Sequence, residues 1–379
     1  MSGTKVRQIL SGVLLALAAV AVTLLLLELV VRVWVHEEAP IVVRDPVVGQ
    51  RFRASRVEDV YSSSAARTIH RSFNALGFRG PDRPTRKLAG VRRLVVMGDS
   101  FIASTALDDA DTLPAVMERA LNAEARGPWE VLGFGVDAYS PAQSVIVWRE
   151  YAKAFAPDVV VFCFFNGNDV GDGDRRVTNY PRPYFSLAAD GTLEQHPMPP
   201  FSASFSRMLG DYSRLYVWQK RRVQALVSRW RAEKGGPPGV LRYLDVQPPQ
   251  LTEESWLLAE RVIALLAQEV RSSGAEFFLV DIPDVVQVRD RDWSAAMTLV
   301  GPESAANLRR DYAERRLAGF AERDGIAFIP LLEPLRQAAH SQEVYLPDGH
   351  WNEAGIRVAA GVILERMGSR VVVEKDPQP

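Results

Sequence analysis

The feature that most constrains this chain is an apolar run near its N-terminus. Ile9–Leu27 contains nineteen residues without a charge, and Lys5 and Arg7 precede it. A run of that length can cross a bilayer as a helix, and cations in front of it favour keeping the N-terminus in the cytoplasm. Because the apolar pattern continues past Glu28 to Trp34, we favour an uncleaved anchor over a cleaved signal peptide or a buried core helix.

The anchor predicts where the other parts of the chain lie. We expect residues 1–35 to form a cytoplasmic tip and one transmembrane helix, residues 36–92 a connecting arm, and residues 93–370 a periplasmic or otherwise extracytoplasmic domain. An insertion at 170–250 interrupts this domain, and residues 371–379 form a tail. The 379 residues carry a net charge of −1 with no basic domain, which argues against nucleic acid as a partner.

Short apolar strands alternate with longer helices along the outer domain. The predicted strands are Arg93–Met97, Glu130–Phe134, Val159–Phe165, Glu276–Ile282 and Gly325–Ile329, and the predicted helices are Leu113–Ala125, Pro141 to about Phe155, Thr252–Ser273, Ala305–Arg323 and Glu353–Met367. This alternation predicts an α/β fold: a three-layer α/β/α sandwich around a mostly parallel five-stranded sheet. Cys163, the single cysteine, lies in an apolar strand, where a buried side chain is favoured over a reactive thiol.

The insertion differs in composition from the regular part of the domain. Its first part is rich in proline and aromatic residues, and a basic helix of about Tyr212–Lys234 follows within the insertion. An insertion of that length without regular structure is typical of a lid or a binding segment. For the basic helix we weigh a solvated helix packed on the domain against contact with a membrane surface or an anionic glycan.

The first predicted strand of the sheet ends in Gly98-Asp99-Ser100. A glycine directly after a buried strand lets the backbone turn sharply and places the next small polar residue at the carboxyl edge of the sheet, where ligands bind in such folds. Alone, this tripeptide favours an ordinary turn or helix cap over a site.

Three later segments fall at the same predicted edge. They are Gly133-Phe134-Gly135, Asn166-Gly167-Asn168-Asp169 and Asp348-Gly349-His350-Trp351-Asn352. A nucleophilic serine needs a base, a group that orients the base, and donors for the developing oxyanion. These segments together supply each of those roles.

Across Arg93–Met367 the sequence resembles the SGNH (GDSL) hydrolase superfamily, whose blocks appear here in order. The resemblance implies a flavodoxin-like sheet, Ser100 as nucleophile, His350 as base and Asp348 as its orienting acid. It further implies an oxyanion hole of the Ser100 and Gly135 backbone N–H groups and the Asn168 amide. Gly98, Asp99 and Asp169 are expected to support the site by shaping, capping and bracing its loops.

The sequence departs from the family pattern at two places. Asn166 stands where the third block usually begins with glycine, and the last block is one residue shorter than the common Asp-x-x-His. The Asp-x-His-Trp form is similar to that in proteins of bacterial polysaccharide O-acetylation, which gives weight to acetyl transfer.

We therefore expect an esterase acting outside the cytoplasm on acylated, especially O-acetylated, carbohydrate or another envelope ester. The alternatives are an O-acetyltransferase for a cell-surface polysaccharide, which shares the acyl-enzyme, and a non-catalytic envelope protein that binds glycans. The sequence shows no metal-ligand cluster, phosphate loop or dinucleotide fingerprint, so we expect no cofactor and no metal.

Overall fold

The computed structural model describes residues 3–34, 41–123, 128–178, 180–198, 209–210, 212–220, 222–223 and 238–371. The chain divides into two compact units. One comprises residues 1–41 and 200–236, and the other comprises residues 42–199 and 237–379. Part of the predicted insertion therefore groups with the N-terminal segment, and the rest groups with the outer domain.

Helix α1 (Gly3–Trp34) carries the apolar run. Its stretch Leu10–Trp34 has a mean hydropathy of 2.8 in its most apolar window, and none of that window is buried by other parts of the chain. By length and composition, α1 is a helix that can cross a membrane.

Glu28, the one carboxylate in this stretch, is fully engaged. It pairs with Arg32 at 2.7 Å and accepts hydrogen bonds from the Ser213 hydroxyl and from the backbone N–H groups of Arg214 and Leu215, at 2.8–3.0 Å. Glu28 thus caps the helical stretch that begins at residue 214. The remainder of the predicted basic helix, including residues 221 and 224–234, lies outside the described residues.

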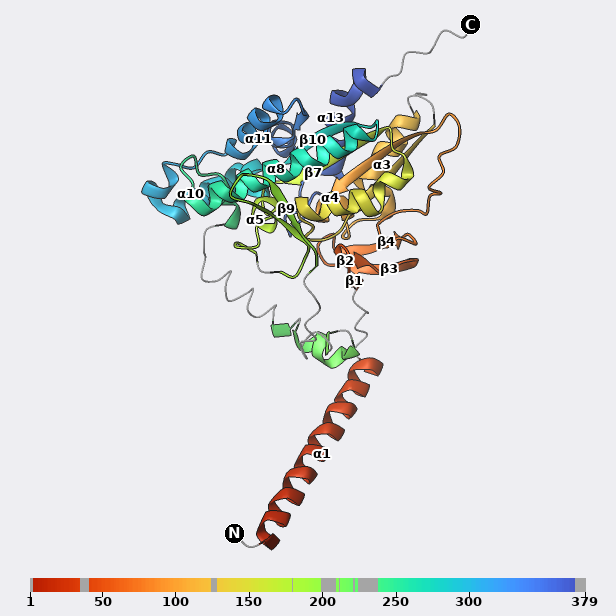
Figure 1. The fold of residues 1–379 in the computed structure, drawn as a ribbon, viewed down its shortest axis with the longest axis vertical. Helices are drawn as coiled ribbons and strands as arrows, with labels where there is room; N and C mark the ends of the chain where they lie inside the picture. Colours follow the sequence, from red (N-terminus) through yellow and green to blue (C-terminus); the bar gives the residue numbers. More distant parts are fainter. Residues whose placement is uncertain are drawn as a thin grey trace. The chain divides into compact units, whose positions relative to one another are not determined.

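A five-stranded parallel sheet forms the centre of the larger unit (Figure 1). Its strands are β5 (Arg92–Gly98), β6 (Trp129–Gly135), β7 (Val159–Phe165), β10 (Glu276–Ile282) and β11 (Ala327–Pro330). Their order is β11-β10-β7-β5-β6, and every pairing is parallel. The predicted fold class is confirmed, and the strand order is flavodoxin-like.

Helices cover both faces of this sheet. On one face, α3 (Leu113–Ala123) and α13 (Glu353–Val371) share a buried cluster with the strands. On the other, α4 (Pro141–Glu150), α8 (Gln250–Ser272) and α11 (Tyr312–Arg323) complete the three layers, with Arg316 of α11 lying over the Trp256 ring of α8. Smaller helices lie between them: α2 (Ser100–Ala103), α5 (Asp169–Asp172), α9 (Val285–Val288), α10 (Asp290–Ala305) and α12 (Leu332–Ala339).

The arm is more regular than its composition predicts. It contains two antiparallel hairpins, β1–β2 (Val42–Asp45 and Gly49–Phe52) and β3–β4 (Arg56–Ser62 and Arg67–Phe73). Burial alternates along β3, but Arg56 and Glu58 occupy half-buried positions while Val57 and Tyr61 are exposed, so the sequence does not show the apolar period of two that a buried strand would show. The described part of the insertion also has structure, in the hairpin β8–β9 (Tyr184–Leu187 and Leu193–His196).

Most predicted elements form close to their expected bounds. Ser140 caps α4 with Pro141 and Gln143 in a full capping box, as predicted. One helix is corrected: instead of one helix over Ala305–Arg323, α10 ends at Ala305 and α11 begins at Tyr312. The expected strand Gly325–Ile329 is likewise shifted to Ala327–Pro330.

Candidate active site

The candidate site lies where the order of the strands reverses. From β5 the chain passes to β6 on one side of the sheet and then to β7 on the other, so a crevice opens at the carboxyl ends of β5 and β7. Ser100 directly follows this end of β5, and Asn168 follows that of β7. The topology therefore brings together segments separated by more than 60 residues.

The turn that carries Ser100 is held by a hydrogen bond of Asp99 and by the close approach of β6. The Asp99 carboxylate accepts a hydrogen bond from the Phe101 N–H at 3.0 Å and caps α2. A Cβ on Gly135 would lie 2.6 Å from Ile102 Cβ and 2.7 Å from the Asp99 carbonyl oxygen. Only glycine permits this approach, so β6 ends against the turn that carries the serine.

His350 connects Ser100 to Asp348. Its Nε2 lies 2.8 Å from Ser100 Oγ, and its Nδ1 lies 3.3 Å from Asp348 Oδ1. The imidazole also packs on the Phe101 ring, at 5.1 Å between ring centroids. Ser100, His350 and Asp348, 250 residues apart at the extremes, thus form one chain of polar contacts in which each ring nitrogen of His350 faces one partner.

The short spacing of the last block has a local explanation. Gly349, between the acid and the base, has a φ of +90°, a conformation that favours glycine. The turn lets Asp348 Oδ1 accept the His350 backbone N–H at 3.1 Å as well as face the ring. Two residues of separation are therefore enough to put the carboxylate beside Nδ1.

The charges of this chain of residues favour an imidazolium. Burial disfavours the charged ring, but the hydrogen bond and charge of Asp348, with Asp99 and Asp137, outweigh burial and raise the pKa of His350 above 6.5. The His350 hydrogen bond is also the main cause that lowers the pKa of Asp348 below its usual range. Asp348 is therefore a carboxylate, the form that orients and stabilises a charged base.

Two buried carboxyl groups lie beneath the site. Burial raises the pKa of Asp99 to about 6, and burial together with the Asp99 charge raises that of Asp169 well above 3.8. Asp169 Oδ2 accepts the Phe165 N–H at 2.9 Å, which braces the loop that carries Asn168. Each carboxyl thus contacts a backbone N–H of a site loop, and neither lines the pocket described next.

A pocket of about 420 Å³ opens above Ser100 and His350. Asn168, Asp137 and Trp351 contribute to its wall. The Asn168 Oδ1 and Asp137 Oδ1 atoms are buried without a hydrogen-bond partner among the described residues. Within the described parts of the chain, no cluster of three or more His, Cys, Asp or Glu side chains is arranged to hold a metal ion.

Two residues of the site were not found from the sequence. Ser64 donates a hydrogen bond to Asp348 Oδ2 at 2.5 Å, and Asp137 follows the end of β6. Ser64 carries no sequence signal, because it lies in a serine-rich turn of the arm. Asp137 has one: the residues just after β6 fall at the same sheet edge as Ser100.

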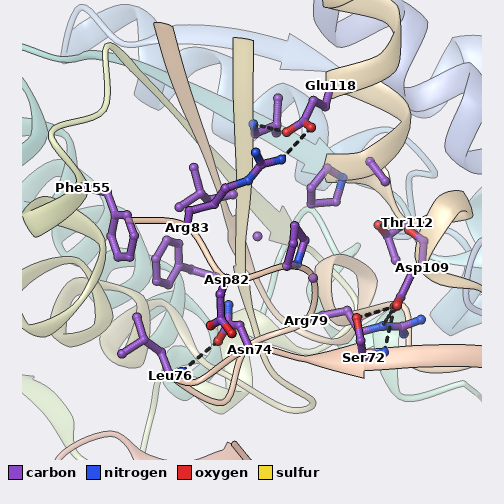
Figure 2. Close-up of a pocket in the computed structure, with 18 of the residues that line it drawn as sticks. Ser72, Asn74, Leu76, Arg79, Asp82, Arg83, Asp109, Thr112, Glu118 and Phe155 are labelled. Atoms are coloured by element: carbon purple, nitrogen blue, oxygen red, sulfur yellow. Dashed lines mark hydrogen bonds and ion pairs between the residues drawn. The ribbon is translucent and has the colours of Figure 1, made fainter. Parts of the chain in front are cut away.

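A second cavity of about 420 Å³ lies between the arm and α3 (Figure 2). Figure 2 shows Arg79 and Ser72 converging on the Asp109 carboxylate, and Arg83 pairing with Glu118. The described lining residues of this cavity differ from those of the Ser100 pocket. Its polar groups join the arm to the domain.

Comparison with known proteins finds distant structural similarity and no sequence match. No family model and no curated protein matches the sequence. Among solved structures, a protein described as TesA is 14% identical with a TM-score of 0.41, over 73% of this chain and 99% of that one. A catalytic mutant of Axe2, an acetylxylan esterase from Geobacillus stearothermophilus, is 14% identical with a TM-score of 0.40, over 76% and 100%.

A lipase/acylhydrolase from Enterococcus faecalis is 12% identical with a TM-score of 0.39, over 75% of this chain and 99% of that one. At TM-scores of about 0.4, these likenesses carry no argument about chemistry. The assignment of the site rests on its own geometry.

Proposed function

We propose that this chain is a membrane-anchored serine esterase that hydrolyses acylated carbohydrate or another envelope ester outside the cytoplasm. One observation carries the proposal: Ser100 Oγ lies 2.8 Å from His350 Nε2 at the floor of an open pocket, while His350 Nδ1 faces a carboxylate. The order of the sequence blocks, which resembles that of SGNH hydrolases, supports it.

The geometry fits an acyl-enzyme mechanism. Ser100 Oγ attacks the ester carbonyl carbon as His350 Nε2 takes its proton, and Asp348 stabilises the imidazolium. The C–O bond to the alcohol then breaks, and His350 returns the proton to the leaving oxygen. Water, deprotonated by His350, attacks the acyl-Ser100 carbonyl and releases the carboxylic acid and free serine.

Three donors are proposed for the tetrahedral oxyanion. The backbone N–H of Ser100 lies at the start of α2, Gly135 lies against the same turn, and Asn168 lines the same pocket as His350. Preorganised donors of this kind are worth about 10²–10³ in rate each. Asp137, a carboxylic residue of the pocket wall, suits a substrate that carries hydroxyl groups, as carbohydrates do.

The proposed test traps the acyl-enzyme in the full-length protein held in detergent micelles. The protein is incubated with acetylated oligosaccharides and simple acetyl esters, quenched in acid, and measured by intact mass and peptide mapping. We expect an acetyl adduct on Ser100 and release of acetate, and S100A should show neither. Full esterase activity in S100A would overturn the mechanism. S186A, which alters another serine bonded to histidine, is the matched control.

An acetyltransferase is the second candidate, favoured by the Asp348-Gly349-His350-Trp351 block. It shares the acyl-enzyme and differs in whether water or a sugar hydroxyl accepts the acyl group. Adding a candidate glycan to the trapped acetyl-enzyme distinguishes them. A transferase loses the adduct faster and yields acetylated glycan, whereas an esterase yields acetate at an unchanged rate.

We further propose that α1 anchors the chain with its N-terminus in the cytoplasm. The stretch Leu10–Trp34 and the preceding cations support this orientation. Protease added to intact spheroplasts should digest the domain beyond residue 41. Cytoplasmic control proteins should be digested only after the spheroplasts are lysed. Protection of the domain in intact spheroplasts would reverse the proposed orientation.

A further inference from the structure

The Asp348 carboxylate uses its two oxygens for two different partners. Oδ1 faces His350, at 3.3 Å from the ring nitrogen and 3.1 Å from the backbone N–H. Oδ2 accepts the hydroxyl of Ser64 at 2.5 Å. Ser64 lies in the turn between β3 and β4, in the arm that precedes the catalytic domain, 284 residues before its partner.

We propose that Ser64 is a positioning residue for the reaction: its hydroxyl fixes the Asp348 carboxylate so that Oδ1 faces the His350 ring. The proposal rests on the proposed function, because it gives Ser64 a role through the base. It also makes the β3–β4 hairpin part of the active site.

Asp348 needs such a partner because of its place in the chain. Its side chain is 39% exposed, and it stands on a loop beside Gly349, so water competes for its oxygens. The distance of 3.3 Å to His350 Nδ1 is longer than a well-formed charged hydrogen bond. A second hydrogen bond on Oδ2 removes the rotation of the carboxylate that would turn Oδ1 away from the ring.

The hairpin is fixed to the domain independently of Ser64. From β4, Arg67 reaches Glu353 of α13 at 2.7 Å and also pairs with Asp108. Arg71 donates to the Thr105 carbonyl at 3.1 Å, and the Ser72 N–H donates to Asp109 at 3.0 Å. Contacts along the whole of β4 therefore hold the turn that carries Ser64 next to Asp348.

The residue Arg79 ties the same segment to the loop after the nucleophile. Its side chain is only 3% exposed, and it pairs with Asp109 at 2.7 Å (Figure 2). It donates to the carbonyl oxygens of Ser104 at 2.8 Å and Leu107 at 2.6 Å. Ser104 and Leu107 line the Ser100 pocket, so the arm contacts both the nucleophile loop and the acid of the proposed triad.

The turn itself does not require the Ser64 hydroxyl. Ser62 Oγ accepts the Ala65 N–H at 3.2 Å and closes the turn. Ser63, between them, is exposed. Of the three consecutive serines, a variant of Ser64 removes the proposed contact, a variant of Ser62 removes the bond that closes the turn, and a variant of Ser63 removes neither.

The experiment is a double-mutant cycle on purified full-length protein, with kcat and KM for an acetyl ester measured for S64A, D348A and S64A/D348A. We expect S64A to lower kcat about tenfold with little change in KM, as loss of a hydrogen bond to a charged group does. In the D348A background S64A should have no further effect, since its acceptor is gone. S64T, which keeps a hydroxyl, should restore most of kcat.

Control variants separate positioning from folding. S63A should match wild type, and S62A should lower the midpoint of thermal unfolding without acting through Asp348. The proposal is overturned if S64A leaves kcat unchanged, or if S64A costs the same factor with and without Asp348. Failure of the proposed function has a different signature, in which S100A retains activity whatever Ser64 does.

Discussion

In the part of the chain that the structure describes, two serine hydroxyls contact a histidine ring, and their surroundings differ. Ser100 Oγ lies 2.8 Å from His350 Nε2, and Ser186 Oγ lies 2.7 Å from His196 Nε2. By this distance alone, the two pairs cannot be told apart.

Their surroundings differ in each respect that nucleophilic catalysis requires. Ser100 opens a helix at the carboxyl edge of a parallel sheet, and the far nitrogen of His350 faces Asp348. Ser186 lies within strand β8, and His196 stacks on Tyr184 with ring centroids 4.4 Å apart. Within the described residues, no carboxylate bonds to the His196 ring. The difference between the two pairs is therefore in the second partner of the histidine, a carboxylate in one and a tyrosine ring in the other.

The largest expected difference between the two pairs appears when each histidine is replaced by alanine in turn. H350A should lower kcat/KM on an acetyl ester by about 10³–10⁴, since Ser100 then has no base. H196A should change kcat/KM by no more than about twofold, because substitutions away from a site usually change free energies by about 0.5 kcal/mol or less. Steady-state kinetics on both variants checks this. Comparable losses in the two variants would show that hairpin β8–β9 takes part in the chemistry.

The next prediction concerns the acid. A protonated His350 cannot accept the Ser100 proton, so wild-type activity should fall as the pH drops through a His350 pKa raised above 6.5. D348N removes the main group that raises this pKa, leaving Asp99 and Asp137, so the acid limb should move to lower pH. At the optimum, kcat should fall by about 10²–10⁴ because the tautomer is no longer fixed.

The exposed His70–Asp59 pair, at 2.8 Å, provides the control for that variant. D59N should leave both the rate and the pH profile unchanged, since His70 does not line the Ser100 pocket. An acid limb that stays in place in D348N would mean that another group titrates in it.

Two asparagines of one loop should separate catalysis from stability. N168A should lower kcat by about 10²–10³ with little change in KM, if Asn168 donates to the oxyanion. Asn166 instead donates to the buried Asp281 carboxyl at 3.0 Å, so N166A should lower the free energy of unfolding by about 1–3 kcal/mol. Chemical denaturation and kinetics on both variants test this pair. A normal kcat in N168A would remove Asn168 from the oxyanion hole.

Much of the fold follows from local pattern. The strand Val159–Phe165 has its predicted bounds because a buried parallel strand is apolar on both faces. The capping box of α4 was readable from Ser140, Pro141 and Gln143 for the same local reason. The helix α10 was not predicted, since Gly301 and Pro302 break its pattern and only one of its side chains is buried.

The site was predictable only where its residues follow a strand or open a helix. Ser100, Gly135 and Asn168 occupy such positions, and His350 was recognised by its motif. The contact between Ser64 and Asp348 could not be predicted, because it depends on how the β3–β4 hairpin of the arm packs on the domain. Hydrogen bonds between distant loops depend on the complete tertiary structure, which no local pattern encodes.

The smallest expected effect is on stability, and its sign should differ between the two serines. Ser186 bonds to His196 within hairpin β8–β9, so S186A should lower the free energy of unfolding by about 1 kcal/mol. Ser100 lies above two buried carboxyl groups, Asp99 and Asp169, in an arrangement suited to chemistry. S100A should therefore be neutral or stabilising, as substitutions at active sites often are. Urea denaturation at fixed pH measures both. If S100A also lowers the free energy of unfolding by about 1 kcal/mol, the two serines contribute equally to stability. The surroundings of Ser100 then do not destabilise the folded protein.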